Sequence, residues 1–186
     1  CSVEFFLPGE HLPIQATCGI EPFGGAWTNF SKKKYRLKFR GELGTAKLKA
    51  PLFEGFDYGF PVVDVFDELE LRAGSHDMES RGFYMAARFV EDTMLDMGSI
   101  NPHGRFVHLY VNGNYWGQYH LRERLVDHFL AEYLGGSPED YFNVRGNDNV
   151  GSSFIPGTPE PAYRDYWIYV RENRGSYEAV KDFIDV

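Results

Sequence analysis

The sequence predicts an α+β fold in which helices pack against an antiparallel sheet. Two patterns in the 186 residues support this class. In the first half, apolar and polar residues alternate in short runs, as they do in half-buried strands. In the second half, apolar residues recur at three- and four-residue steps, which is the spacing of one helix face. A hydrophobic content of 43% is enough for the core of one ordinary domain.

Several strands are predicted before the middle of the chain. Residues 2–6 and 13–20 flank a turn and are expected to pair as a hairpin. Residues 34–40 alternate apolar with basic side chains, which predicts a strand with one basic face. Residues 66–72 form a further candidate strand, and the stretch 51–61 between them is expected to be a loop rich in Gly, Phe and Pro.

The stretch 105–121 carries the strongest local signal. Two runs of aromatic and β-branched residues flank Asn112-Gly113. A type I′ turn needs positive φ at both central residues, which this dipeptide tolerates, so a β-hairpin is predicted. The hairpin leads into the charged cluster Arg122-Glu123-Arg124, where a helix is expected to begin.

Three helices are predicted from residue 82 onward. The first spans 82–97 and stops at Gly98, the second spans 123–134 before Gly135-Gly136, and the third begins at Ser176. The apolar stripe expected on the first helix comprises Phe83, Ala86, Ala87, Val90, Met94 and Met97.

The end of the chain shows two further features. Residues 146–164 are polar, rich in Gly, Pro and Asn, and without periodicity, so a flexible loop is predicted there. The last helix stops at Val186 after two to three turns. We therefore expect the chain to be a segment cut from a larger protein.

Two cysteines, Cys1 and Cys18, fall opposite each other if the first hairpin folds about Gly9 and Glu10. Such positions satisfy the geometry of a disulfide, which would indicate an exported protein. The alternatives are two buried thiols, or a lipid anchor on Cys1.

The net charge of −8 and the pI of about 5.2 argue against general binding to nucleic acid or anionic membranes. No apolar run reaches the roughly 18 residues of a membrane span, and no signal-peptide pattern is present. Against this acidic background, the stretch from Lys32 to Lys49 holds eight of the 19 Lys and Arg residues. It is either a face that binds polyphosphate or the solvated outer face of a sheet.

Acidic and amide residues give weaker signals. Glu123 and Asp127 lie four positions apart at the expected helix start, so they form either a shared site for a metal or donor, or stabilising charge at a helix N-terminus. A polar turn with a helix cap is expected around Asp77. An oxygen-rich loop is either an Asx-rich turn or a Ca²⁺ loop, but its spacing fits no EF-hand, and no metal ligand is assigned; its residues are Asn143, Asn147, Asp148 and Asn149.

In their order along the chain, these segments resemble the spore coat protein H (CotH) family of atypical, secretory-type protein kinases. The most specific block is HLYVNGNYWGQYHLRER. The other matching segments are SVEFFLPG, CGIEPFGG, SKKKYRLKFR, PLFEG, FDELELRAGSHD, the helix ending in DMG, FLAEYLGGSPEDYFNV and GNDNVG. The resemblance covers nearly the whole chain.

The resemblance implies that residues 1–186 form a kinase-like N-terminal lobe with the hinge and the start of a C-terminal lobe. Lys32 would face the phosphates of ATP, with Arg36 and Lys38 as companions, and Glu123 would lie near the hinge and the nucleotide. A complete protein would use ATP with Mg²⁺ or Mn²⁺ to phosphorylate Ser or Thr of a surface or coat protein. It would be extracellular or bound to the cell surface, as the family's secretory type implies.

The sequence departs from the family in three places. Ala86-Ala87 stands where the family often has an Arg-Asp pair, and Val126 stands where an Asp is common. The catalytic and metal-binding carboxylates of the family lie in DW- and DxD-like motifs of a C-terminal lobe, and no such motif occurs before Val186. No catalytic residue is therefore assigned, and the chain alone is expected to be inactive.

The alternative is a catalytically inactive, extracellular interaction module on a degenerate kinase fold. Tyr115, Trp116 and Tyr119 on the central hairpin would then be exposed and would contact a protein or a carbohydrate.

Overall fold

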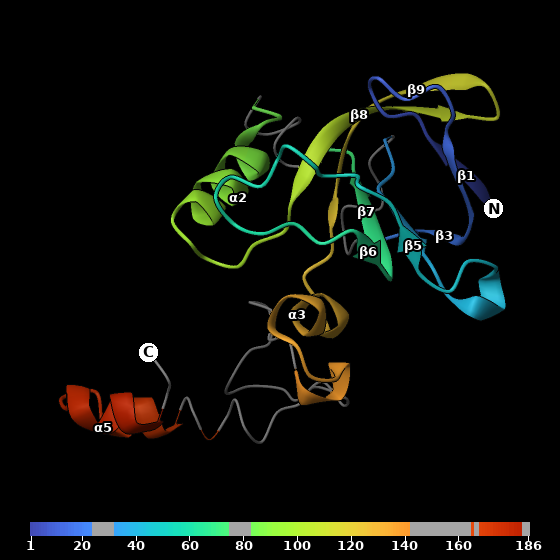
Figure 1. The fold of residues 1–186 in the computed structure, drawn as a ribbon. Coiled ribbons are helices and arrows are strands. Elements are labelled where there is room, and N and C mark those ends of the chain that lie inside the picture. Colours follow the sequence, from blue (N-terminus) through green and yellow to red (C-terminus); the bar gives the residue numbers. More distant parts are fainter. Residues whose placement is uncertain (24–31, 75–82, 142–164, 166–167, 184–186) are drawn as a thin grey trace. The chain divides into compact units, whose positions relative to one another are not determined.

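All the described strands lie within the first 123 residues of the chain, with one α-helix before the last two strands, and further helices follow them (Figure 1). The computed structural model describes residues 1–23, 32–74, 83–141, 165 and 168–183. The chain divides into two compact units, Cys1–Pro138 and Glu139–Val186. The mixture of helices with antiparallel sheets confirms the predicted α+β class.

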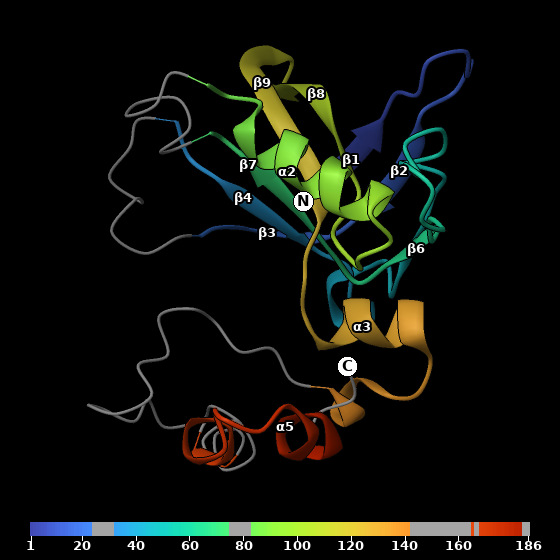
Figure 2. The same ribbon diagram turned by 90° about the vertical axis from the view of Figure 1, so that its left-hand side faces the viewer.

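The first unit is built on a five-stranded antiparallel sheet (Figure 2). Alternating side chains give the central strands one apolar face, and pairing places those faces together: Tyr35 lies opposite Leu71, which in turn lies opposite Leu121. In spatial order the strands are β3 (Gly19–Pro22), β4 (Tyr35–Lys38), β7 (Glu68–Arg72), β9 (Asn114–Glu123) and β8 (Gly104–Val111).

Two smaller sheets flank this one. The predicted first hairpin is confirmed as β1 (Ser2–Phe5) and β2 (Ile14–Thr17), with Val3 opposite Ala16. The second small sheet pairs β5 (Leu48–Lys49) with β6 (Val65–Phe66) and was not predicted, because two-residue strands leave no alternation to detect. A single 3₁₀ turn, η2 (Gly41–Leu43), follows β4.

The hydrophobic core lies on one face of the large sheet, which we call the core face. Side chains of β4, β7 and β9 meet there with residues of β2, β5 and β6 and of the loop that follows β5. The largest buried members of this cluster are Tyr119, Phe39, Phe53, Leu52 and Leu69.

The two cysteines lie side by side, as predicted. The backbone N–H of Cys18 donates to the carbonyl of Cys1 (2.9 Å), and the two Sγ atoms are 3.5 Å apart. Both are free thiols in this structure, Cys1 exposed and Cys18 buried. Burial raises the pKa of the Cys18 thiol.

The predicted Asn-Gly hairpin is confirmed. Asn112 and Gly113 have φ of 52° and 80°, and Val111 pairs with Asn114 across the turn. Tyr115 and Trp116 are exposed, as expected, but the prediction for Tyr119 was wrong. Tyr119 is 0% exposed, because it lies on the core face, and its hydroxyl donates to the carbonyl of Lys33 (2.9 Å).

The first predicted helix forms as α2 (Ala86–Asp96), and Gly98 follows it with φ of 81°, as a helix stop requires. Its expected apolar stripe is only partly covered. Phe83, Val90 and Met97 are exposed, whereas Arg88, Glu91 and Leu95 are the buried residues of the helix. The helix packs with a polar face because the sheet opposite is charged (Figure 2).

The second predicted helix begins later than expected. Strand β9 continues through Glu123, and α3 (Asp127–Leu134) starts four residues further on. Glu123 and Asp127 therefore do not share a helix face. Val126 occupies the N-cap position in an extended conformation without a side-chain hydrogen bond to the helix, and Gly135 ends the helix with φ of 81°.

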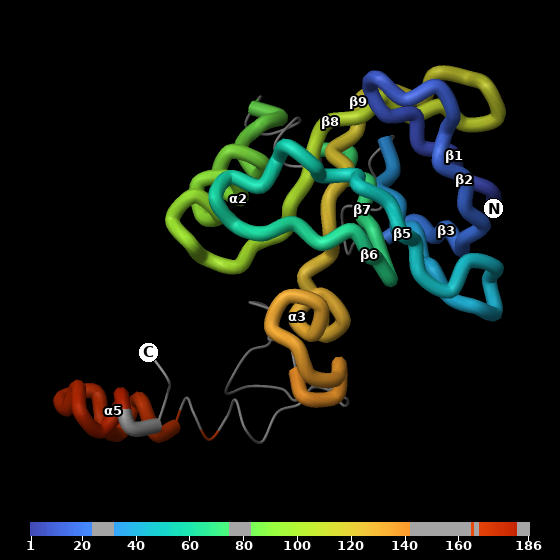
Figure 3. The backbone as a smooth tube through the Cα atoms, in the orientation of Figure 1, coloured from blue at the N-terminus to red at the C-terminus, as the bar shows by residue number. Residues whose placement is uncertain are grey.

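Two further described elements are the 3₁₀ turn η3 (Pro138–Asp140) and α5 (Tyr177–Phe183), which follows Ser176 as predicted (Figure 3). Several predictions concern positions outside the described residues. They are the flexible loop 146–164, the oxygen-rich loop at Asn143 to Asn149, and the polar turn around Asp77.

Candidate functional site

The face of the large sheet opposite the core carries a network of ion pairs, and we call it the charged face. Strand alternation places every second residue there: the basic side chains of β4 line up with acidic side chains of β7 and with arginines of β9. The charged face comprises Glu21, Arg36, Lys38, Glu68, Glu70, His120, Arg122 and Arg124, with Arg88, Glu91 and Asp92 of α2 packed on it.

Two of the predicted site residues share one carboxylate on this face. Arg36 Nη1 lies 2.6 Å from Glu21 Oε1, and Lys38 Nζ lies 2.8 Å from Glu21 Oε2. The hydrogen bond from Lys38, together with the charges of both cations, lowers the pKa of Glu21. Arg36 Nε also lies 3.7 Å from Glu68 Oε2, so Arg36 and Lys38 are brought together but both already have acidic partners.

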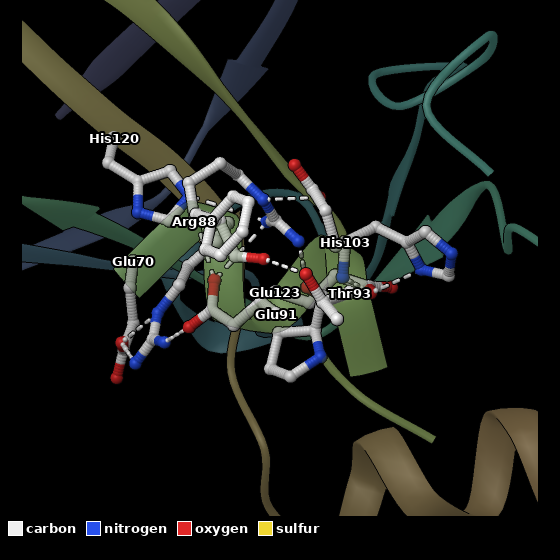
Figure 4. A network of polar contacts seen from close by, with 11 residues as sticks. Glu70, Arg88, Glu91, Thr93, His103, His120 and Glu123 are labelled. Carbon is white, nitrogen blue, oxygen red and sulfur yellow. Dashed lines mark hydrogen bonds and ion pairs between the residues drawn. The ribbon is translucent and has the colours of Figure 1, made fainter. Parts of the chain in front are cut away.

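Arg122 is the centre of a second ion-pair group (Figure 4). Its guanidinium pairs with Glu70 of β7 (Nη2 to Oε2, 2.8 Å) and with Glu91 of α2. Both carboxylates are buried. Burial of the guanidinium by itself would lower the pKa of Arg122. The interactions with Glu70 and Glu91 outweigh this effect, so the pKa is raised. This group ties α2 to the sheet.

Arg88 and His120 form the adjoining polar layer between α2 and β9 (Figure 4). Arg88 Nη1 lies 3.4 Å from His120 Nε2, and Arg88 Nη2 donates to the carbonyl of Pro102 (3.0 Å). Burial, reinforced by the neighbouring arginines, lowers the pKa of His120 to about 2, although Glu91 lies 3.8 Å away. His120 is consequently neutral at physiological pH.

Lys32 lies apart from these ion pairs, beside the middle of β9. Its ammonium is 4.6 Å from the ring centre of Tyr119 and 5.1 Å from that of Tyr84, and it donates to the carbonyl of Gln118. Burial lowers the pKa of Lys32. Among the described residues, no carboxylate forms an ion pair with it.

Glu123, the fourth predicted site residue, lies on the core face and is only 2% exposed. One oxygen of the carboxylate accepts a hydrogen bond from the backbone N–H of His103 (2.7 Å) and also lies 3.0 Å from Nδ1 of the same residue. The other oxygen accepts from the hydroxyl of Tyr133 (2.8 Å). Burial and the Glu123 charge raise the pKa of Tyr133. The cavity beside Glu123 measures about 20 Å³, room for one water molecule.

The structure therefore groups Arg36 with Lys38 and places Lys32 and Glu123 in separate surroundings. Sequence reasoning missed the central roles of Arg88, Glu91 and Arg122. Arg88 and Glu91 are three residues apart on a helix, which was a usable signal, but the expectation of an apolar stripe drew attention away from it.

Within the described ranges, no group of three or more His, Cys, Asp or Glu side chains is arranged to hold a metal ion. No helix in these ranges is both long and apolar enough to cross a membrane.

The fold and the site define an α+β protein whose sheet has one apolar face and one charged face, with a helix tied to the charged face by ion pairs. The family model described as CotH kinase protein matches residues 20–186. The chain belongs to the CotH kinase family and is a kinase-like protein, as the sequence resemblance indicated. A search of curated proteins finds no significant match.

Proposed function

We propose that this chain is the nucleotide-binding N-terminal part of a CotH kinase. In the complete protein, the γ-phosphate of ATP would pass to a Ser or Thr of a surface or coat protein. Membership of the kinase family supports ATP as the nucleotide and a divalent cation, Mg²⁺ or Mn²⁺, as its companion. The observation that carries the proposal for this chain is the environment of Lys32.

Lys32 has the properties of a group that receives an anion. Its ammonium is partly removed from water between Tyr84 and Tyr119, and the described carboxylates leave it without an ion-pair partner. A charge that is desolvated and not neutralised gains more from a phosphate oxygen than a solvated surface lysine does. The residues present at Lys32 therefore fit a triphosphate.

Arg36 and Lys38 support the same role less directly. Glu21 already holds both, so phosphate would bind them only in competition with that carboxylate. The predicted contact of Glu123 with the nucleotide stays a prediction. A bound cation would neutralise charge on the phosphates, and we propose that its protein ligands and the catalytic base lie outside residues 1–186, so that this chain alone is inactive.

Thermal denaturation with Mg²⁺ and ATP tests the proposal. We expect ATP to raise the Tm of the chain in a saturable way. Lys32→Ala should weaken binding, so that the ATP concentration needed for the half-maximal rise in Tm increases tenfold or more. Lys49→Ala, an exposed lysine on β5, is the matched control and should bind like the wild type. An ATP response that is absent, or equal in all three proteins, would contradict the proposal.

The cellular location of the protein is a further part of the proposal. We infer that the parent protein acts outside the cytoplasm or at the cell surface, with a protein as its substrate or partner. Protease accessibility of the native protein on intact cells tests the location. Protein that is protected on intact cells and cleaved only after lysis would contradict it.

A second candidate function is supported by the tip of the β8–β9 hairpin. Tyr110, Tyr115 and Trp116 are exposed there, and the rings of Tyr110 and Tyr115 are 5.3 Å apart. Exposed aromatic clusters are common in contact surfaces, which fits an inactive module that binds protein or carbohydrate. Retention on a glycan or protein array that depends on Trp116, and not on exposed Leu12, would favour this function.

A further inference from the structure

A large apolar cavity lies on the core face of the sheet, away from the charged face and Lys32. It has a volume of about 540 Å³ and lies between the β1–β2 hairpin and strand β8. Its floor includes Leu37, Leu71 and Leu121 from the middle of the sheet. A volume of this size is in the range of small-molecule sites.

The cavity is elongated along β8. Its lining includes every residue of that strand from Arg105 to Tyr110. At roughly 3.3 Å per residue, this stretch is about 17 Å long. Val107 and Leu109 stand on the same side of the strand as Arg105, because alternate residues share a face, so the three follow one another along the cavity.

Among the described residues that line the cavity, Arg105 is the one Lys or Arg, and the lining also includes Glu4 and His108. Arg105 is half-buried, its Nη1 donates to the carbonyl of Leu52 (3.3 Å), and its guanidinium stacks 4.8 Å from the ring centre of Phe56. Among the described residues, no carboxylate pairs with Arg105. Glu4, the one acid on the lining, is exposed and takes a hydrogen bond from Gln15. A guanidinium with free donors therefore marks one end of the cavity.

The opposite wall of the cavity is the β1–β2 hairpin, whose strands pair only with each other and not with the large sheet. An isolated two-stranded sheet has little stability of its own. Val3, Phe5 and Leu7 of this hairpin are only partly buried against the core, so the wall is held by side-chain contacts that a ligand can replace.

We propose that this cavity binds an amphipathic anion: a single long aliphatic chain with a carboxylate at one end. The chain occupies the apolar space along β8, and the carboxylate pairs with Arg105. An empty space of this size leaves its lining without packing partners, and water finds few hydrogen-bonding groups there. An aliphatic chain restores the packing contacts, and the carboxylate neutralises the half-buried guanidinium.

Titration of the 186-residue chain with dodecanoate, 1-dodecanol and hexanoate tests the proposal by calorimetry. We expect saturable one-to-one binding of dodecanoate, with dodecanol and hexanoate each at least tenfold weaker. Arg105→Gln should remove the preference for dodecanoate over dodecanol. Val107→Trp fills the cavity and should abolish binding, whereas Val111→Trp at the exposed hairpin tip should leave it unchanged.

A second measurement covers the case in which Val107→Trp fails to fold. In the wild-type protein, methyl NMR signals of Leu37, Leu71, Leu109 and Leu121 should shift with dodecanoate, whereas those of exposed Leu134 should not. Dodecanoate that binds without saturation, or shifts that spread evenly over the protein, would overturn the proposal. The ATP-dependent rise in Tm, which tests the proposed role of Lys32, does not depend on either outcome.

Discussion

Glu91 of α2 and Arg122 of β9 form an ion pair that joins the only long helix of the described residues to the sheet. Arg122 is shared with Glu70, so helix and two strands meet at one guanidinium. The helix is therefore positioned by charge, and several of its apolar side chains remain exposed, among them Phe89 at 66% and Met97 at 72%.

Removal of the Glu91 carboxylate tests this positioning. Glu91→Ala should lower the free energy of unfolding by about 2 kcal/mol, less than the roughly 3–5 kcal/mol of a fully buried pair, because Glu70 still pairs with Arg122. Urea denaturation measures the change. Asp96→Ala on the exposed end of the same helix is the control and should stay within about 0.5 kcal/mol of the wild type. Equal losses in the two variants would show that the ion pair does not hold the helix.

Close packing above Gly104 gives a second prediction. A Cβ added there would lie 2.7 Å from His120 Nε2 and 2.8 Å from Arg122 Cβ, and closer still to Arg88 Nη1. Gly104→Ala should therefore cost about 2 kcal/mol through displacement of this buried layer. Gly41→Ala, whose new Cβ would meet only Ala46 at 3.9 Å, should be nearly neutral by the same urea assay. A neutral Gly104→Ala would mean that the layer yields easily.

The fold was largely predictable because local rules and tertiary packing agree over most of the chain. Alternation in 34–40 and 66–72, and the Asn112-Gly113 turn, each gave a correct strand or turn. The start of the second helix was misplaced at Glu123 because a strand ending in charged residues looks like a helix N-terminus. In the structure Glu123 still belongs to strand β9, because it pairs within the sheet and its buried carboxylate bonds His103 and Tyr133 from other parts of the chain.

The candidate site was less predictable than the fold. Basic residues of β4 were correctly placed on one face, but the sequence does not reveal that Glu21 forms ion pairs with both Arg36 and Lys38. Which cation keeps an unneutralised charge depends on register and on side-chain packing between residues far apart in the sequence. For the same reason, the cation–π contacts of Lys32 with the rings of Tyr84 and Tyr119 could not be predicted from the sequence.

Acid should destabilise the protein through His120. Its pKa is lowered from 6.5 to about 2 in the folded state, so below pH 6.5 the unfolded chain binds a proton that the folded chain does not. The contribution of neutral His120 to the free energy of unfolding is fully present above pH 6.5. Between pH 6.5 and 2, the free energy of unfolding falls by up to about 1.4 kcal/mol per pH unit.

The measurement compares urea denaturation at pH 7 and pH 5 in three proteins. His120→Gln keeps an acceptor for Arg88 but does not titrate, so its stability should decrease less on acidification than that of the wild type. His11→Gln, an exposed histidine near the first turn, should follow the wild type. A pH dependence identical in all three would show that His120 is protonated as easily in the folded state as in the unfolded state.

Oxidation should join the two cysteines. The backbones of Cys1 and Cys18 are hydrogen-bonded neighbours with Sγ atoms 3.5 Å apart, so a disulfide needs little rearrangement. We expect the two free thiols to disappear under a glutathione redox buffer and the Tm to rise, with a gain of about 3 kcal/mol for a loop of this length. The raised pKa of Cys18 should make the reaction faster at pH 9 than at pH 7. Thiol labelling with mass spectrometry checks this, and a Cys1→Ser variant that gains the same stability on oxidation would contradict it.

The buried carboxylate of Glu123 gives the last prediction. It accepts from the backbone N–H of His103 and from the hydroxyl of Tyr133. An amide in its place would direct N–H groups at one of these donors, so Glu123→Gln should lower the free energy of unfolding by about 2 kcal/mol. Tyr133→Phe keeps the carboxylate but removes the hydroxyl, which donates to Glu123, lies 2.8 Å from Nδ1 of His103 and accepts from the N–H of Val63 (3.4 Å), and it should cost about 1–2 kcal/mol. Urea denaturation measures both.

Nucleotide titration of the same two variants then separates a structural role of Glu123 from its predicted place at a hinge. The Tyr133→Phe protein keeps the carboxylate, whereas Glu123→Gln loses its charge. If the half-maximal ATP concentration rises tenfold in Glu123→Gln alone, the carboxylate contacts the nucleotide or fixes a group that does. If both variants bind ATP like the wild type below their melting temperatures, Glu123 only stabilises the junction between β9 and α3, and Lys32 remains the residue of this chain through which nucleotide binding is to be sought.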